Sequence, residues 1–133
     1  QHVARGYTHA GGKSVTWRDN VATRPARGSA AGGSYSTVTD LLAFDQALVQ
    51  AKLGSVAWSE WATGGPRPDR SSGTGEHGEP GFGFAGGAPG IASDWTHEGD
   101  RTLIVLTNVD PQATQRTMES LRAILQRMSR STP

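Results

Sequence analysis

Apolar residues recur at helical spacing in two parts of the chain. The first part follows Ser34, in STVTDLLAFDQALVQAKLG, and five apolar residues form one stripe there: Leu41, Leu42, Phe44, Leu48 and Val49. Thr37 and Asp40, three residues apart, match a capping box, and Gly54 suits the left-handed position that ends a helix. We therefore predict an amphipathic helix over residues 36–53.

The second helical repeat lies near the end of the chain. Its apolar members are Met118, Leu121, Ile124, Leu125 and Met128. Asp110 is the expected N-cap, and Pro111 fits the first helical position, where a missing amide proton costs nothing. The pattern predicts a C-terminal helix over residues 111–129 that packs on a sheet. A shorter helix is expected over residues 56–63, VAWSEWAT, which places its two tryptophans on one face.

Strand patterns fill residues 84–108. Residues 90–97 and 101–108 read as two strands joined at Glu98-Gly99-Asp100, a hairpin turn in which glycine supplies the unusual backbone angle. The run Leu103 to Leu106 is apolar on both faces, so we expect a central, covered strand. With the glycine-rich stretch before them, these strands predict a three-stranded antiparallel meander.

The remaining segments show no sustained period. Residues 1–33 are expected to form an irregular or extended lead, in which only Ser14 to Arg18 has strand character. Residues 64–83 hold glycine, proline and small polar residues, which predicts a long surface loop. A chain of 133 residues suits one domain. The expectation is thus a single α+β domain over residues 1–133.

Composition narrows the classes of function. Thirteen Lys and Arg residues nearly balance twelve Asp and Glu residues, so no broad field favours nucleic acid. The absence of cysteine excludes a disulfide framework, and the four histidines show no metal-ligand spacing, so neither a metal nor another cofactor is expected. No run approaches the roughly 20 apolar residues of a membrane span. Gln1 is a poor natural start, and the opening looks like a cut inside a longer protein.

The most informative stretch for chemistry is Gly81 to Ile91, GFGFAGGAPGI. Glycines that lead into a strand let the backbone lie close to a ligand or to a neighbouring strand, because they have no side chain to hold it away. This stretch is therefore the expected binding region.

Several segments, taken in order, resemble one known family. They are Gly6-Tyr7, AGGSYST at 31–37, Asp40-Leu41, Phe44, Gly81-Phe82-Gly83, GGAPG at 86–90 and VLTN at 105–108. Together they resemble the C-terminal part of the serine β-lactamase (class C) and penicillin-binding superfamily, with its D-alanyl peptidases and esterases. The resemblance covers the whole chain and implies hydrolysis of an amide, β-lactam or ester bond through an acyl-serine, in a periplasmic or secreted protein.

Two catalytic motifs of that family are absent from this sequence. The nucleophilic serine should have a lysine three residues later, and no serine here has one. The family's Tyr-x-Asn is missing too, since Tyr7 precedes Thr-His and Tyr35 precedes Ser-Thr. In the family both motifs come before the Gly-Tyr region with which this chain opens. The resemblance therefore implies that they belong to a missing N-terminal part.

The third family motif, Lys or His followed by any residue and glycine, aligns with Phe84-Ala85-Gly86. Phenylalanine can neither donate a hydrogen bond nor attract a substrate carboxylate, so Phe84 either abolishes or retunes the third motif. By resemblance, Phe84, Ala85, Gly86 and Gly87 line the substrate site, and the Gly87 amide forms half of an oxyanion hole. The simpler alternative is that Gly86 and Gly87 only permit a tight strand entrance.

Other motifs favour structural interpretations. Gly11-Gly12-Lys13-Ser14 lacks the earlier glycine of a phosphate loop, and Lys52-Leu53-Gly54 suits the end of a helix. The tryptophans suggest core or interface packing. His97, beside Glu98, is the histidine best placed for a pH-sensitive contact.

Three functional hypotheses follow. The first is the C-terminal portion of a serine β-lactamase-like hydrolase, which is not catalytic alone and whose partner is its missing N-terminal part. The second is a stand-alone binding or self-assembly module, which forms homo-oligomers through an open sheet edge. The third is a complete small enzyme with unrecognised residues, which requires a serine, threonine or aspartate within hydrogen-bonding reach of a histidine.

Overall fold

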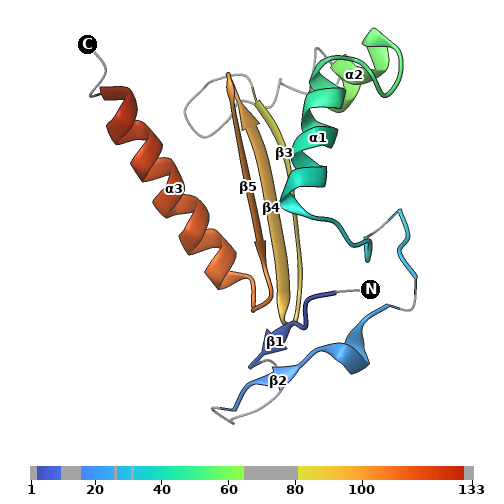
Figure 1. The fold of residues 1–133 in the computed structure, drawn as a ribbon, viewed down its shortest axis with the longest axis vertical. Coiled ribbons are helices and arrows are strands. Elements are labelled where there is room, and N and C mark those ends of the chain that lie inside the picture. Colours follow the sequence, from blue (N-terminus) through green and yellow to red (C-terminus); the bar gives the residue numbers. More distant parts are fainter. Residues whose placement is uncertain (1–2, 10–15, 26, 31, 65–80, 131–133) are drawn as a thin grey trace. The chain divides into compact units, whose positions relative to one another are not determined.

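The computed structural model describes residues 3–9, 16–25, 27–30, 32–64 and 81–130 (Figure 1). The chain divides into two compact units. Unit 1 comprises residues 1–35, 85–94 and 105–133, and unit 2 comprises residues 36–84 and 95–104. The expectation of a single domain over residues 1–133 stays a prediction. Among the described residues, no helix is long and apolar enough to cross a membrane.

Three strands form the main sheet, in the order β3 (Gly81–Ala88), β4 (Ile91–Glu98) and β5 (Arg101–Thr107). Two-residue turns join them, and each turn contains a glycine with positive φ: Gly90 at 78° and Gly99 at 60°. A β-carbon is disfavoured at such angles, so glycine sets these turns. The predicted α+β class, with a three-stranded antiparallel meander and packed helices, is confirmed.

One strand prediction is wrong. The apolar run Leu103 to Leu106 was expected in a central strand, but β5 is at the edge of the described sheet and β4 is in the middle. Val105 is buried, whereas Leu106 is 38% exposed. The run is apolar on both faces, yet the described sheet offers it a neighbouring strand on one side only.

Two helices belong to unit 2, α1 (Val38–Val49) and α2 (Val56–Ala62). The Thr37 hydroxyl accepts a hydrogen bond from the Asp40 amide at 3.1 Å, which stabilises the start of α1 as the sequence pattern indicates. The end of α1 differs from the prediction. The left-handed residue there is Ala51, with φ of 53°, and Gly54 does not have a positive φ.

The buried face of α1 also differs from the predicted stripe. Leu48 is buried, but Leu42, Phe44 and Val49 are 39%, 43% and 50% exposed. Asp45 is only 1% exposed. Its carboxylate forms hydrogen bonds with residues of β4 and β5. These bonds satisfy Asp45 on the buried face of α1, where the predicted stripe had only apolar residues.

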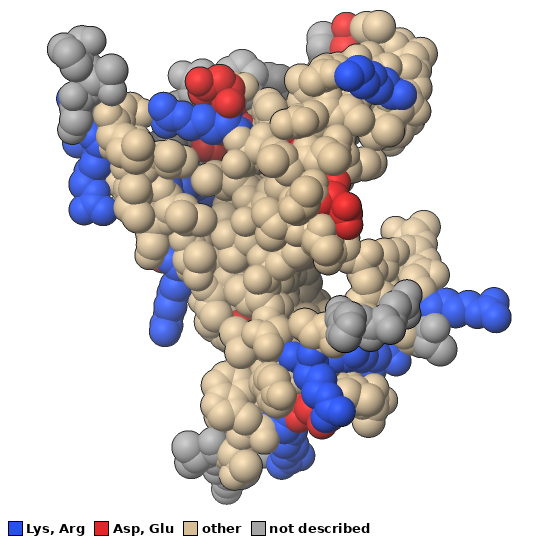
Figure 2. Space-filling model, in the orientation of Figure 1, with Lys and Arg blue, Asp and Glu red and all other residues tan. Residues whose placement is uncertain are grey.

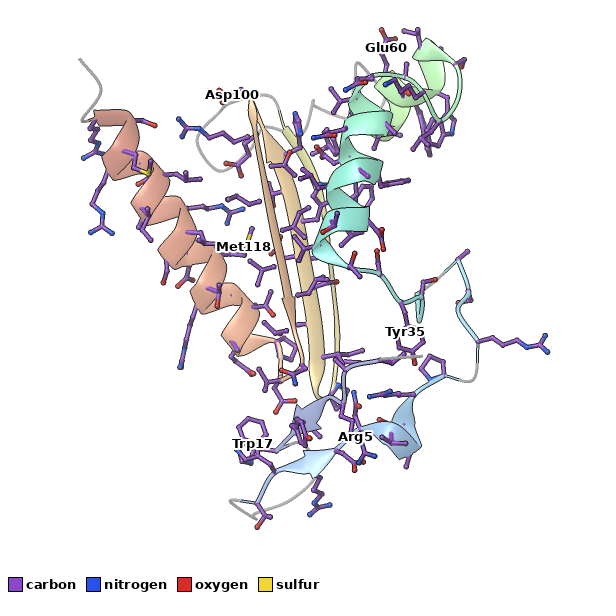
Figure 3. The ribbon with its side chains drawn as sticks, viewed as in Figure 1. Arg5, Trp17, Tyr35, Glu60, Asp100 and Met118 are labelled. Atoms are coloured by element: carbon purple, nitrogen blue, oxygen red, sulfur yellow. The ribbon has the colours of Figure 1, made fainter. Side chains whose placement is uncertain are left out.

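Unit 1 contains α3 (Gln112–Arg130), which packs through Thr114 and Met118, its two buried residues. Met118 points from α3 toward the strands (Figure 3) and is 1% exposed. Ala92 of β4 and Val105 of β5 are the other buried apolar residues of this unit. Its apolar core among the described residues is therefore small.

The N-terminal segment contains more structure than the irregular lead that its sequence predicts. β1 (Tyr7–Thr8) pairs antiparallel with β2 (Arg18–Asp19), and a short 3-10 helix, η1, covers Val21–Thr23. Buried Asn20 accepts a hydrogen bond from the Gly6 amide and donates one to the Pro89 carbonyl. Part of the predicted strand at 14–18 lies outside the described residues, as does most of the predicted 64–83 loop, whose last three residues belong to β3.

Candidate functional site

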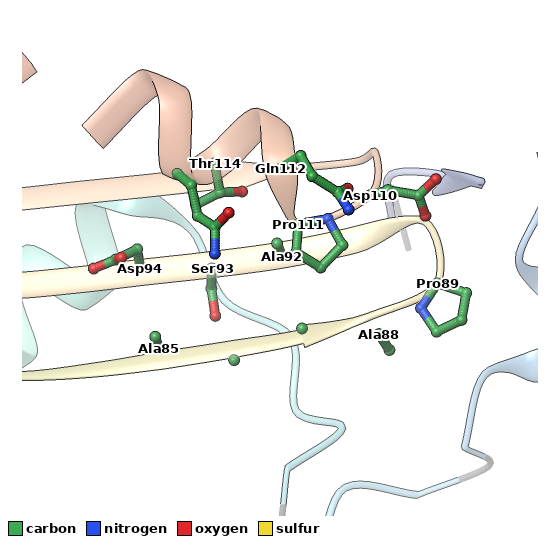
Figure 4. Close-up of a pocket in the computed structure, with 13 residues that line it drawn as sticks. Ala85, Ala88, Pro89, Ala92, Ser93, Asp94, Asp110, Pro111, Gln112 and Thr114 are labelled. Atoms are coloured by element: carbon green, nitrogen blue, oxygen red, sulfur yellow. The ribbon is translucent and has the colours of Figure 1, made fainter. Parts of the chain in front are cut away.

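A pocket of about 710 Å³ lies within unit 1, at the end of β3 (Figure 4). Its walls come from residues 85–89, from residues 92–94 of β4 and from the start of α3. The predicted site residues Ala85, Gly86 and Gly87 line it. Phe84 does not; it belongs to unit 2, is 59% exposed, and its ring centroid lies 5.4 Å from that of Trp95. The structure thus brings three of the four predicted residues to one pocket.

The glycines of β3 differ in how much space a side chain would have at each position. A β-carbon at Gly83 would lie 2.5 Å from the Trp95 carbonyl oxygen, so the approach of β4 requires glycine there. A β-carbon at Gly87 would meet Pro111 at 3.0 Å, which is tight. One at Gly86 would meet only the Ser93 hydroxyl, at 3.4 Å. Strand packing therefore explains why position 83 is glycine. It does not require glycine at position 86, where the absence of a side chain leaves the pocket wall open.

Asp110, at the edge of this pocket, joins three segments. Its carboxylate accepts hydrogen bonds of 2.9 Å from the amides of Gly90 and His9. Three hydrogen bonds hold the pKa of Asp110 below its ordinary value, and the bond from the Thr8 side chain has a larger effect than the two from the amides. Asp110 was predicted to cap α3, but its side chain instead ties the N-terminal segment to the β3–β4 turn.

The pocket lacks the cationic and imidazole groups of a serine hydrolase site. Ser93 and Thr114 supply hydroxyls and Asp94 and Asp110 supply carboxylates, but none of the lining residues is lysine, arginine or histidine. The Thr114 hydroxyl is already bonded to that of Thr107 at 2.6 Å. A serine hydroxyl needs an adjacent base to attack a carbonyl carbon. Among the described lining residues, no hydroxyl is bonded to a lysine or a histidine.

Unit 2 contains a second constellation, centred on the buried carboxylate of Asp45. Its Oδ1 accepts a hydrogen bond from Trp95 Nε1 at 2.8 Å. Its Oδ2 accepts one from the Thr102 hydroxyl at 2.8 Å and lies 3.0 Å from His97 Nδ1. Thr102 Oγ1 is also 3.1 Å from His97 Nδ1. An aspartate and a threonine therefore lie within hydrogen-bonding reach of a histidine, as the hypothesis of a complete small enzyme requires.

The arrangement nevertheless differs from a catalytic triad. Aspartate and threonine approach the same ring nitrogen of His97, Nδ1. In a serine triad the carboxylate and the nucleophile bond to opposite nitrogens. Since the Thr102 hydroxyl donates to Asp45, it is not positioned as a nucleophile on Nε2.

One aromatic ring stacks on the histidine, and further rings lie around Trp95. Phe82 stacks on the His97 ring with centroids 5.0 Å apart and an interplanar angle of 14°. The Trp95 ring lies 5.4 to 5.6 Å from those of Phe44, Phe82 and Phe84. These contacts place the polar cluster beside an aromatic surface.

The sequence pattern indicated His97 as the histidine best placed for a pH-sensitive contact, but it did not indicate its partner. The structure shows that partner to be Asp45, 52 residues away. The available signal was the position of Asp45, four residues after Leu41 and three before Leu48, on the inward side of a helix. Among the described residues, no group of three His, Asp or Glu side chains is arranged to hold a metal ion.

Neither a protein-family model, nor a curated protein, nor a solved structure matches this chain. The resemblance to the serine β-lactamase superfamily therefore depends on the quoted sequence segments alone.

Proposed function

We propose that this chain is the C-terminal portion of a serine β-lactamase-like hydrolase, whose nucleophile and activating lysine come from an N-terminal part. The observation that carries the proposal is the position of β5. Its Leu103 to Leu106 run is apolar on both faces, as in a central strand, yet β5 is at the edge of the described sheet.

An edge strand presents N–H and C=O groups that have no strand partner on one side. In the resembled family, the N-terminal part supplies the first strands of the sheet. Addition of such a strand beside β5 would pair these backbone groups and would give Leu106, which is 38% exposed, a cross-strand neighbour. The apolar pattern of β5 would then agree with its surroundings.

The pocket at Ala85 to Gly87 supports the same proposal. It has a glycine wall but no lysine or histidine among its lining residues. In the proposed whole protein, this wall borders the acyl-serine and the Gly87 amide helps to stabilise the oxyanion. With Phe84 in place of Lys or His, the third motif does not attract a substrate carboxylate.

The test is to compare the isolated chain with a product that includes the preceding coding sequence. We expect an in-frame Ser-x-x-Lys and Tyr-x-Asn upstream of Gln1. The longer protein should react with a fluorophosphonate probe at that serine and hydrolyse a chromogenic β-lactam or an ester, whereas the isolated chain should not be labelled. Fluorophosphonate labelling of a serine in the isolated chain would contradict the proposal.

A self-assembly module is the second candidate, and the exposed apolar side chains of unit 2 favour it. They are Val38, Leu42, Phe44, Val49, Leu53, Val56, Trp58, Trp61 and Phe84, each at least 39% exposed. On the face shown in Figure 2, the charged side chains lie in a few groups, and the surface between these groups belongs to other residues. Large exposed apolar areas mark interaction surfaces or aggregation-prone sites.

Light scattering across a concentration series tests this candidate. Self-association through β5 should give a dimer or larger species, and Leu106→Lys should shift it toward monomer because a lysine on an edge strand disfavours pairing. A monomer at high concentration would exclude homo-oligomerisation as the function of the chain.

A further inference from the structure

We infer that Asp45 and His97 form an acid–base site, separate from the Ala85–Gly87 pocket, that accepts activated aryl esters. The inference starts from the geometry around Asp45. Its buried carboxylate is fixed by Trp95 and Thr102, and it contacts one nitrogen of His97 at 3.0 Å.

The position of the ring proton follows from these contacts. Asp45 Oδ2 and an unprotonated Nδ1 would face each other as two acceptors at 3.0 Å, which is unfavourable. The Thr102 hydroxyl has a single proton, and it donates this proton to Asp45. Nδ1 of the neutral ring therefore carries the hydrogen and donates it to the carboxylate, which leaves the lone pair on Nε2.

Nε2 has no hydrogen-bond partner in the described part of the chain, and it is not among the fully buried polar atoms that lack one. The His97 side chain as a whole is 18% exposed. A neutral imidazole held by a carboxylate, with no hydrogen bond on its second nitrogen, is the arrangement of a general base.

The surrounding rings indicate the class of substrate. Phe82 stacks on His97, and Phe84, which contacts Trp95 in the same cluster, is 59% exposed. Phe44, whose ring centroid lies 5.5 Å from that of Trp95, is 43% exposed. An aryl group can pack on exposed rings of this kind, and the inferred site places its ester at the His97 ring, on which Phe82 stacks.

The reaction is hydrolysis, in which water is the only co-reactant. Nε2 removes a proton from a water molecule as the water oxygen adds to the ester carbonyl carbon. The bond from that carbon to the aryl oxygen then breaks, and the leaving phenolate takes the proton from the imidazolium. The products are a carboxylic acid and a phenol, and the imidazole returns to its neutral form.

The groups that face the His97 ring come from three elements. The elements packed against the ring contribute Phe82 from β3, Thr102 from β5 and Asp45 from α1. Asp45 is the only charged group among these contacts, and Glu98 follows His97 on its own strand.

The decisive measurement is hydrolysis of p-nitrophenyl acetate by the purified chain. We expect His97→Gln to lower the second-order rate constant about tenfold or more, since general bases contribute roughly 10²–10⁴-fold in evolved sites. His9→Gln is the matched control, because the His9 ring packs on Trp17 outside this cluster, and it should retain the rate. Equal rates for the wild type and a folded His97→Gln variant would overturn the inference.

Two further measurements keep the inference testable if His97→Gln does not fold. Nitrogen-15 NMR of the wild type should show the Nδ1–H tautomer for His97, and the Nε2–H tautomer would overturn the inference. Ester turnover by the isolated chain should also continue after treatment with a fluorophosphonate. If the reagent inhibits turnover and labels a serine, both this inference and the proposed function are contradicted. If the isolated chain shows no ester turnover at all, this inference fails and the proposed function is unaffected.

Discussion

The indole nitrogen of Trp95 donates a hydrogen bond to the carboxylate of Asp45 at 2.8 Å, and both residues are buried. This bond joins α1 to β4 within unit 2. A buried carboxylate is costly unless its oxygens are paired, and Asp45 satisfies this need through Trp95, Thr102 and His97. The cluster is therefore part of what holds α1 on the strands.

Asp45→Asn should lower the free energy of unfolding by about 2 kcal/mol, because it removes the charge to which three side chains donate. Urea unfolding monitored by tryptophan fluorescence measures the change. Asp40→Asn is the control on the same helix, where the carboxylate is exposed, and its effect should stay within about 1 kcal/mol. Equal effects of the two substitutions would contradict a stabilising role for the buried cluster.

Met118→Ala should destabilise the chain by about 2–5 kcal/mol, since it leaves a cavity at a position that is 1% exposed. Met128 lies ten residues later on the same helix and is 61% exposed. Met128→Ala should change the stability by less than about 0.5 kcal/mol. Chemical denaturation of both variants tests whether α3 packs through the Met118 face, and a larger loss for Met128→Ala would show that it does not.

Gly83→Ala and Gly86→Ala should differ, although both add one methyl group to β3. At position 83 the new carbon would lie 2.5 Å from a β4 carbonyl oxygen, so we expect a loss of about 1–3 kcal/mol. At position 86 it would meet only the Ser93 hydroxyl, at 3.4 Å, so stability should be nearly unchanged. Thermal unfolding compares the two, and a destabilised Gly86→Ala variant would favour a purely structural reason for that glycine.

Local patterns in the sequence predicted most of the elements. The Thr37 cap and the Gly99 turn depend on residues close in sequence, and the structure contains both. The burial of Asp45 was missed because its three hydrogen-bond donors lie at least 50 residues away. Helical periodicity alone cannot report such partners, so it assigned the inward face of α1 to Leu42, Phe44 and Val49.

Two further differences have similar causes. An apolar run on both faces of β5 predicts a central strand, but the described sheet provides only one neighbour for it. Asp110 before Pro111 is typical of the start of a helix, where the aspartate caps the first turn. In the structure its carboxylate instead accepts hydrogen bonds from the amides of residues 9 and 90. For the candidate site, the sequence indicated the glycine wall of the pocket and His97, and tertiary contacts determined which side chains accompany them.

Asp110→Asn should reduce stability near neutral pH, and this difference should shrink in acid. The carboxylate has a pKa below its ordinary value of 3.8 in the folded chain, so its stabilising effect is complete above the unfolded pKa. The effect is lost as the pH falls through the folded pKa. Melting temperatures from pH 7 to pH 2 test this dependence, with Asp100→Asn as the exposed control. A difference between wild type and Asp110→Asn that stays constant over this range would contradict it.

The contact between His9 and Asp110 also has a consequence for the order of folding. The two residues are 101 positions apart, and Gly90, which shares the carboxylate, is 20 positions from it. The entropy lost in closing a loop rises with its length, so the shorter closure is favoured. We therefore expect the β3–β4 hairpin to meet the start of α3 first, and the N-terminal segment to join as a late step on a surface that has already assembled.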